Sequence, residues 1–250
     1  MSNIKYNSPN IQQYFSKERI DWDDFYLSEK KIIEQVFETF QDVNNIEVLD
    51  IGCACAGLCN ALIKKFGIRK YTGIEINEYA AETARKNLNL TSKLDKFNIY
   101  SNDFLEIKNN IHNNFYECVF SLSCIDWQKN FELMFLESWK KVKPGGYFIL
   151  SLRITDQPSI NDINKSYQYI NYNGIKEGEI APYVIFNLND IMKLFLSLDV
   201  MSIKAYGYEN DVSSVAVTDY EKLCFTVFAL QKNVQHNKNK KYLAFNLTIK

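Results

Sequence analysis

Three acidic side chains stand at or near the ends of short hydrophobic segments. Asp50 lies near the end of segment 46–51, Glu75 near the end of 70–76, and Asp103 near the end of 97–104. A carboxylate at such a position can accept hydrogen bonds from both hydroxyl groups of a ribose or from an adenine amino group. The spacing therefore predicts that the three acids line one edge of a sheet, where a nucleoside-containing ligand would bind.

A loop of small residues follows the first of these acids. The stretch Gly52-Cys-Ala-Cys-Ala-Gly57 comes directly after an apolar strand, and helical periodicity runs from Leu58 to Phe66. Small side chains let the backbone approach a ligand closely. A strand, a tight turn and a helix in this order are typical of the nucleotide-binding end of an open α/β sheet.

The elements that must position this site follow in order along the chain. A fourth apolar strand is predicted over 116–123, a helix over 131–142, and a turn at Pro144-Gly145-Gly146 that opens a fifth strand over 147–152. A helix over 190–198, capped by Asn187 or Asn189, and two antiparallel strands over 200–208 and 222–230 complete the predicted fold.

This ordered set resembles the class I S-adenosylmethionine-dependent methyltransferases over residues 46–152. The family pattern Asp/Glu-x-Gly-x-Gly-x-Gly stands here as Asp50-Ile-Gly52-Cys-Ala54-Cys-Ala56, so alanine replaces two of the three glycines. Because alanine is strained by roughly 1 to 2 kcal/mol in a left-handed conformation, we expect a slightly altered loop. The resemblance implies an α/β, Rossmann-like fold with a mostly parallel seven-stranded sheet and helices on both faces.

The resemblance also implies a cofactor site. S-adenosyl-L-methionine would be bound, and S-adenosyl-L-homocysteine would be the product. The residues assigned to cofactor binding lie in the loop and at the strand ends: Asp50, Gly52, Cys53, Ala54, Gly57, Leu58, Glu75, Ile76, Asn102, Asp103, Phe104, Ser121 and Trp127.

Three alternatives stay open. A nicotinamide-dependent oxidoreductase has the same order of strand, tight turn, helix and strand-end acid. Its Gly-x-Gly-x-x-Gly fingerprint is only partly matched from Gly52, and its pattern does not include the later Pro-Gly-Gly turn. A methyltransferase acting on a macromolecule is favoured only by the lysine-rich C-terminus. A catalytically silent binding protein is favoured only by Ala54 and Ala56.

The predicted domain organisation has three parts. Residues 1–45 form an N-terminal helical lid segment, residues 46–231 form the catalytic domain, and residues 232–250 form a lysine-rich tail. The tail is interpreted as a solvated extension, with an edge strand over 242–249 as the alternative. An insertion near 153–189 is too long for an ordinary connection and is expected on the substrate side.

Candidate substrate-binding residues are aromatic or cationic and lie in the lid and the insertion: Tyr14, Arg19, Trp22, Arg153, Tyr169 and Tyr172. Arginine binds carboxylate or phosphate through a planar fork, so Arg19 and Arg153 indicate an anionic acceptor. The expected reaction is O-methylation of a small phosphorylated or nucleotide-activated, sugar-like metabolite for capsule or surface polysaccharide biosynthesis. Asp126 and Tyr183 are the candidate catalytic residues, and a reaction without a general base remains an alternative.

Composition bounds the remaining expectations. The 250 residues carry a net charge of −1, which gives no electrostatic footprint for nucleic acid. No apolar run has the ~20 residues that span a bilayer, no signal peptide is recognised, and the six cysteines lack metal-binding spacing, so we expect a reduced, cytoplasmic protein without a metal. A monomer or a homodimer is expected.

Overall fold

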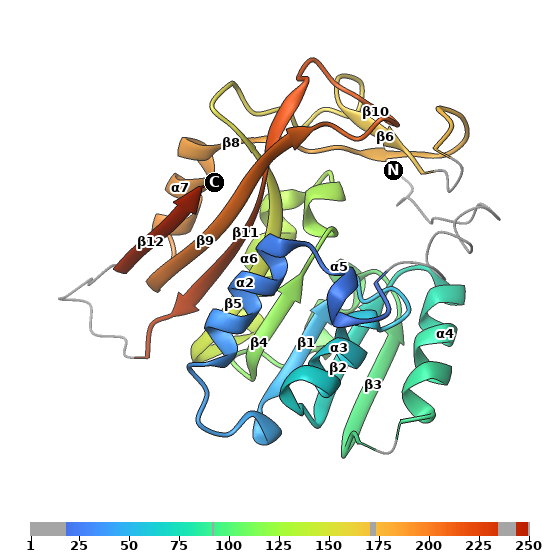
Figure 1. Ribbon diagram of the computed structural model, residues 1–250, viewed down its shortest axis with the longest axis vertical. Coiled ribbons are helices and arrows are strands. Elements are labelled where there is room, and N and C mark those ends of the chain that lie inside the picture. Colours follow the sequence, from blue (N-terminus) through green and yellow to red (C-terminus); the bar gives the residue numbers. More distant parts are fainter. Residues whose placement is uncertain (1–18, 92, 171–173, 235–243, 250) are drawn as a thin grey trace.

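The computed structural model describes residues 19–91, 93–170, 174–234 and 244–249. Its centre is a nine-stranded sheet in the order β12-β9-β11-β5-β4-β1-β2-β3, with β8 paired to β5 (Figure 1). The strands are β1 (Glu47–Ile51), β2 (Lys70–Glu75), β3 (Lys96–Ser101), β4 (Tyr116–Ser121), β5 (Val142–Thr155), β8 (Phe186–Asn187), β9 (Val200–Asp211), β11 (Lys222–Lys232) and β12 (Ala244–Ile249).

Most neighbouring strands are parallel, and only β11 runs antiparallel to both β5 and β9. The predicted Rossmann-like α/β fold is confirmed, with β8 and β12 added to the seven expected strands. The interpretation of the tail as a solvated extension is wrong for residues 244–249. They form the edge strand that was the alternative, because β9 offers an unpaired edge and β12 pairs with it in parallel.

Helices cover both faces of the sheet. On one face lie α2 (Leu27–Phe37), α3 (Gly57–Phe66) and α4 (Glu78–Asn89), and on the other α5 (Phe104–Ile107), α6 (Phe131–Lys141) and α7 (Leu188–Leu196). Four 3-10 turns connect them: η1 (Trp22–Asp24), η2 (Val43–Asn45), η3 (Lys108–Asn110) and η4 (Ile125–Trp127). Of the two predicted caps for α7, Asn187 is the one observed, because its side chain accepts from the Asn189 amide.

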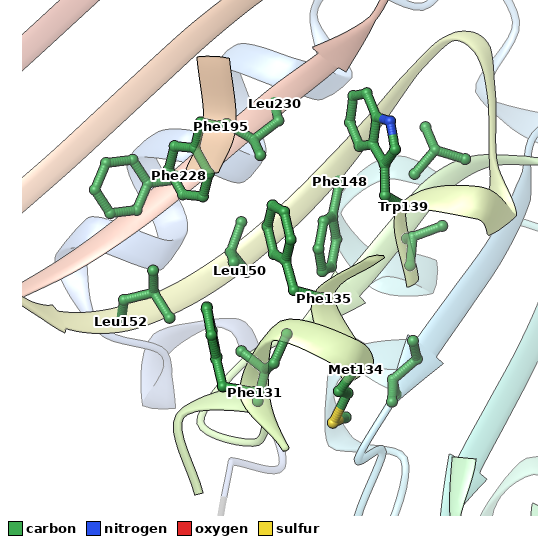
Figure 2. Close-up of a cluster of buried hydrophobic side chains, with 14 of the residues drawn as sticks. Phe131, Met134, Phe135, Trp139, Phe148, Leu150, Leu152, Phe195, Phe228 and Leu230 are labelled. Carbon is green, nitrogen blue, oxygen red and sulfur yellow. The ribbon is translucent and has the colours of Figure 1, made fainter. Parts of the chain in front are cut away.

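Two hydrophobic cores result from the alternation of side chains along the strands. On β5, Tyr147 and Ile149 join the core under α2 and α3, whereas Phe148 and Leu150 join the core under α6 and α7. Figure 2 shows the second core, in which rings from the two helices and from β5 and β11 meet. These fully covered strands hold their carboxyl ends in fixed positions.

The Pro144-Gly145-Gly146 segment lies inside β5 and does not precede it, so the predicted turn is corrected. Gly145 has φ +84°, and the register of β5 against β4 shifts between Tyr116 and Cys118. A Cβ on Gly146 would lie 2.8 Å from the carbonyl oxygen of Glu117. The segment is therefore a bulge that glycine alone fits, and the strand continues through it.

A second, three-stranded sheet contains β6 (Tyr167–Tyr169), β7 (Ile180–Pro182) and β10 (Ala216–Val217), in the order β10-β6-β7. Two of its strands come from the insertion after β5, and the third comes from the connection between β9 and β11. Figure 1 shows it beyond the carboxyl end of the parallel strands. Within the described residues no helix is long and apolar enough to cross a membrane, and no His/Cys/Asp/Glu group could hold a metal ion.

Candidate functional site

A pocket of about 570 Å³ opens at the carboxyl ends of the parallel strands. It is lined by twelve of the thirteen residues predicted to bind a cofactor, namely Asp50, Gly52, Cys53, Ala54, Gly57, Leu58, Glu75, Ile76, Asn102, Asp103, Phe104 and Trp127. Ser121 is the exception. It is fully buried and is not among the lining residues, which at this strand end are Leu122, Ser123 and Cys124.

The loop after β1 takes left-handed turns at each position of the glycine pattern. The φ angles are +83° at Gly52, +45° at Ala54 and +64° at Ala56. Gly52 has no substitute, since an added Cβ would lie 2.5 Å from the sulfur of Cys124. The two alanines thus keep the conformation at the cost of backbone strain, in line with the expectation of a slightly altered loop.

Glu75 ties this loop to the end of β2. Its carboxylate accepts from the amide of Ala54 at 2.9 Å and from the amide of Asn77 at 2.8 Å. Burial raises the pKa of Glu75, and these amides oppose the rise. The carboxylate is thereby fixed on the pocket wall by backbone donors from both sides of it.

Asp50 is buried beneath the same loop. Its Oδ2 accepts from the Tyr71 hydroxyl at 2.7 Å. Burial raises the pKa of Asp50 to about 7, with the Tyr71 hydrogen bond opposing and the charge of Glu75 adding to the rise. The chain therefore holds a carboxylate under conditions that disfavour its charge.

Asp50→Asn should stabilise the free protein, and more at pH 8 than at pH 5. Below pH 4 the Asp50 carboxyl is protonated in both the native and the unfolded protein. Between about pH 4 and pH 7 it stays protonated only in the native protein, so the free energy of unfolding falls as pH rises. Above pH 7 this loss of stability is constant. Asparagine removes this loss and can still accept from Tyr71. Urea unfolding at the two pH values should show a gain that is roughly 2 kcal/mol larger at pH 8. An equal gain at both values would contradict the raised pKa.

Arg19 crosses the mouth of the pocket from the N-terminal side. Its Nη1 lies 2.8 Å from Oε1 of the buried Glu29, and its Nη2 donates to the Ser123 hydroxyl at 2.8 Å. Its guanidinium also lies 5.0 Å from the ring centroid of Tyr26. Arg19 therefore joins α2 to the loop after β4, on the wall of the pocket.

Gly57→Ala should displace Arg19 from its position beside α3. An added Cβ would lie 1.6 Å from the carbonyl oxygen of Arg19, so the Arg19 backbone must move away from the start of α3. We expect trypsin to cleave after Arg19 at least ~10-fold faster in the variant, because local opening sets the rate of cleavage. Mass spectrometry of a short digest identifies the cut.

The matched control is Gly67→Ala at the other end of α3. Gly67 has a left-handed φ of +80°, unlike Gly57, and the nearest atom to an added Cβ is 3.6 Å away. Its substitution should lower stability by about 1 kcal/mol without faster cleavage after Arg19. Equal cleavage in both variants would show that general destabilisation, and not contact with Gly57, sets the rate.

The far end of the pocket is built around Arg153. Its Nη1 lies 3.1 Å from Asp126 Oδ2 and 3.0 Å from the Asp126 carbonyl oxygen, and its guanidinium carbon lies 3.7 Å from the ring centroid of Tyr183 and 4.8 Å from that of Trp127. All four residues line the pocket. Asp126 and Tyr183, the predicted catalytic pair, are thus brought together by a side chain predicted to bind substrate.

Several polar atoms at this end make no hydrogen bond of ordinary geometry among the described residues. Asp126 Oδ1, Trp127 Nε1 and the Tyr183 hydroxyl are buried without a hydrogen bond of ordinary geometry. Burial raises the pKa of Asp126, and the charge of Arg153 opposes this. Burial also raises the pKa of Tyr183, against Arg153 and the nearby Ser213 amide. Buried polar groups without partners are rare in proteins, and here the three residues that carry them also line the pocket.

The other residues predicted to bind substrate differ in whether they line the pocket. Tyr169 lines the pocket, whereas Tyr14 and Tyr172 lie outside the described residues. Trp22 is a correction: its ring packs edge-on to Phe66 at 5.4 Å and does not line the pocket. Sequence reasoning missed Glu29, Gln168 and Tyr208, which line the pocket from α2, the small sheet and β9. No local pattern marks them, because the fold alone brings their elements to the strand ends.

Residues 49–150 match the family model described as a methyltransferase domain. This segment is similar to a methyltransferase domain. It contains the loop, Asp50, Glu75, Asp103 and Asp126, so the residues predicted to bind a cofactor and one of the two candidate catalytic residues lie inside the matched region. Arg153, Tyr183 and the small sheet lie outside it and are features of this chain that the match does not describe.

Solved structures with the same fold superpose on most of the chain. A SAM-dependent methyltransferase from Methanosarcina mazei superposes with a TM-score of 0.59 at 17% identity, over 84% of this chain and 99% of that one. Phosphoethanolamine N-methyltransferase 2 from Haemonchus contortus gives 0.57 at 14%, over 83% and 54%. The [4+2]-cyclase SpnF gives 0.56 at 12%, over 82% of each. A comparison with curated proteins finds no match.

Proposed function

We propose that this protein transfers a methyl group from S-adenosylmethionine to an oxygen of a small, hydroxylated, sugar-like metabolite. The enzyme is a methyltransferase of the EC 2.1.1 class, and S-adenosylmethionine is its cofactor. The observation that carries the proposal is the single pocket that runs from the strand-end acids to the buried polar groups beside Arg153. One end suits a nucleoside, and the other suits a small polar acceptor.

The cofactor end fits the group it would hold. Glu75 and Asp103 lie where carboxylates can accept from the ribose hydroxyls and the adenine amino group, and Phe104 offers an apolar wall. Six acidic side chains and two arginines line the pocket: Glu29, Asp50, Glu75, Asp103, Asp126, Asp211, Arg19 and Arg153. This excess of acids favours a ligand with a net positive charge, which the sulfonium and ammonium groups give to S-adenosylmethionine.

When bound, S-adenosylmethionine supplies a methyl group already activated by its sulfonium. The residues of this chain then have to place the acceptor in line with that methyl group and exclude water, which can supply most of the acceleration. Asp126, which lines the pocket, is the proposed general base that takes a proton from an acceptor hydroxyl. Tyr183 and Trp127 can orient that hydroxyl through their own polar atoms.

The insertion supports a small acceptor. Gln168, Tyr169 and Ile170 of the insertion and Val215 of the β9–β11 connection lie on the pocket wall, so the small sheet borders the pocket. A pocket of this size suits a metabolite and does not suit an extended polymer. The reading as a macromolecular enzyme is weakened further because residues 244–249 of the tail belong to the sheet edge.

The narrower expectation was a phosphorylated or nucleotide-activated sugar for capsule or surface polysaccharide biosynthesis. It relied on Arg19 and Arg153 as anion-binding groups, and each has a carboxylate partner in the structure. A phosphate on such an acceptor would therefore lie toward the open side of the pocket, away from Arg153. We keep the sugar-like acceptor as the proposal and the polysaccharide pathway as a hypothesis that rests on the sequence resemblance.

The test has two stages. Calorimetry with S-adenosylhomocysteine, with NAD as the control ligand, should show micromolar binding of the first and none of the second. The protein is then incubated with methyl-labelled S-adenosylmethionine and a panel of sugars, sugar phosphates and nucleotide sugars, and label in the product is counted. NAD binding in place of S-adenosylhomocysteine would overturn the cofactor assignment, and transfer only to protein or nucleic acid fractions would overturn the small-molecule acceptor.

A further inference from the structure

The acceptor end of the pocket contains a buried ion pair whose two members are unequally satisfied. Arg153 contacts Asp126 through both its carboxylate and its carbonyl oxygen, and its Nη1 also lies 3.4 Å from the Val184 carbonyl oxygen. The Asp126 carboxylate by contrast contacts Arg153 through Oδ2, and its Oδ1 makes no hydrogen bond of ordinary geometry among the described residues. Arg153 is 5% exposed and Asp126 4%, so water does not screen the pair effectively.

This pair removes the positive charge that an anion would need. Arg153 is held by one carboxylate and two carbonyl oxygens, and its guanidinium contacts the rings of Tyr183 and Trp127, which are perpendicular to each other. The other arginine of the pocket, Arg19, contacts Glu29. A phosphate or carboxylate brought to the acceptor end would meet the second oxygen of Asp126, and like charges at short distance in a buried site repel strongly.

The atoms left without partners match a hydroxyl group. Oδ1 of Asp126 can only accept while ionised, Trp127 Nε1 can only donate, and the Tyr183 hydroxyl can do either. An alcohol donates one hydrogen bond and accepts others, so it satisfies both kinds of group at once. An anionic oxygen has no proton to give to Asp126 and would leave it unsatisfied.

We propose that the Asp126–Arg153 pair makes the acceptor end of the pocket a subsite for a neutral hydroxyl and excludes anionic groups from it. Asp126 is the specificity-determining residue, and Arg153 is a positioning residue that keeps the carboxylate in place. The inference rests on the proposed function only in naming this end as the acceptor end. It replaces the expectation that Arg153 itself binds an anion.

The test uses inorganic phosphate as a probe and requires no turnover. Three forms of the full chain are compared, with and without saturating S-adenosylhomocysteine: the wild type, Asp126→Asn, and Asp126→Asn/Arg153→Gln. Asp126→Asn leaves Arg153 without its carboxylate, so it should gain an anion site that the double variant lacks. Melting temperatures are measured at pH 7 in 50 mM phosphate and in chloride of equal ionic strength. This phosphate concentration is enough to fill an anion site with a dissociation constant of about a millimolar.

We expect phosphate to raise the melting temperature of Asp126→Asn by about 2 °C or more beyond its effect on the double variant. The wild type should respond like the double variant. A wild-type response larger than that of the double variant would overturn the proposal, because Arg153 would then bind anions despite Asp126. An equal response of the single and double variants would also overturn it, because Asp126 would not be what excludes the anion.

Asp126→Asn can be too unstable to melt cooperatively, since it leaves a buried charge without its partner. In that case circular dichroism at 10 °C replaces the melting curve, and phosphate should restore native signal to the single variant and not to the double variant. Absence of restoration counts against the proposal. Failure of the proposed function shows separately, as a lack of S-adenosylhomocysteine binding by the wild type.

Discussion

Glu75→Gln should weaken S-adenosylhomocysteine binding by about 10- to 100-fold, the effect of losing a charged hydrogen-bond acceptor. The Glu75 carboxylate holds the amides of Ala54 and Asn77, and it lies on the pocket wall where ribose hydroxyls are expected to donate. Glutamine keeps the shape of the side chain but turns one acceptor oxygen into a donor, which then faces a backbone amide. Both the loop and the ligand contact should be affected, and calorimetry at pH 7.5 measures the loss.

The matched control is Glu78→Gln. Glu78 is exposed at the start of α4, three residues beyond Glu75, and it does not line the pocket. It carries the same charge and undergoes the same chemical change, so binding should stay within about twofold of the wild type, as for an ordinary surface substitution. If the two variants bind equally well, Glu75 does not contact the ligand and the cofactor has to be placed elsewhere in the pocket.

The grouping of the strand-end acids and the small-residue loop on one pocket wall could be predicted because its determinants are local. An apolar strand, a loop of small residues and an amphipathic helix are contiguous in sequence, and the acids Asp50 and Glu75 mark strand ends by their position alone. Parallel strands bring their carboxyl ends to one edge, so the sequence order implies that these acids share a pocket wall. The left-handed φ angles of Ala54 and Ala56 also follow from the glycine pattern that they replace.

The acceptor end could not be predicted in the same way. Asp126 and Arg153 lie 27 residues apart and meet because β4 and β5 are neighbours, and the Tyr183 ring reaches Arg153 from the insertion. The sequence shows an arginine near a strand end but does not show that Asp126 is its partner. The prediction that Arg153 binds an anion therefore did not take this ion pair into account. Trp22 illustrates the same limit, since an aromatic ring in a lid segment can pack on α3 as readily as on a substrate.

Asp126→Asn should reduce turnover by about 10²- to 10⁴-fold with whichever acceptor the panel identifies, which is the usual contribution of a general base. Asp126 lines the pocket, and its Oδ1 is buried without a hydrogen bond of ordinary geometry among the described residues. Asparagine keeps the volume but cannot take a proton. The loss should appear in kcat, while S-adenosylhomocysteine affinity should stay within about threefold, because the acids that would hold the nucleoside lie at the other end.

The pH dependence of turnover distinguishes a general-base role of Asp126 from a packing role. Burial raises the pKa of Asp126 and Arg153 limits the rise, so wild-type turnover should increase with pH through that pKa and then level off. The Asn variant should show a flat profile at its low rate. Asp211→Asn, another acid of the same pocket, should keep both the rate and the profile. A flat wild-type profile together with full activity of Asp126→Asn would mean that positioning alone drives the transfer, and that Asp126 acts only on the choice of acceptor.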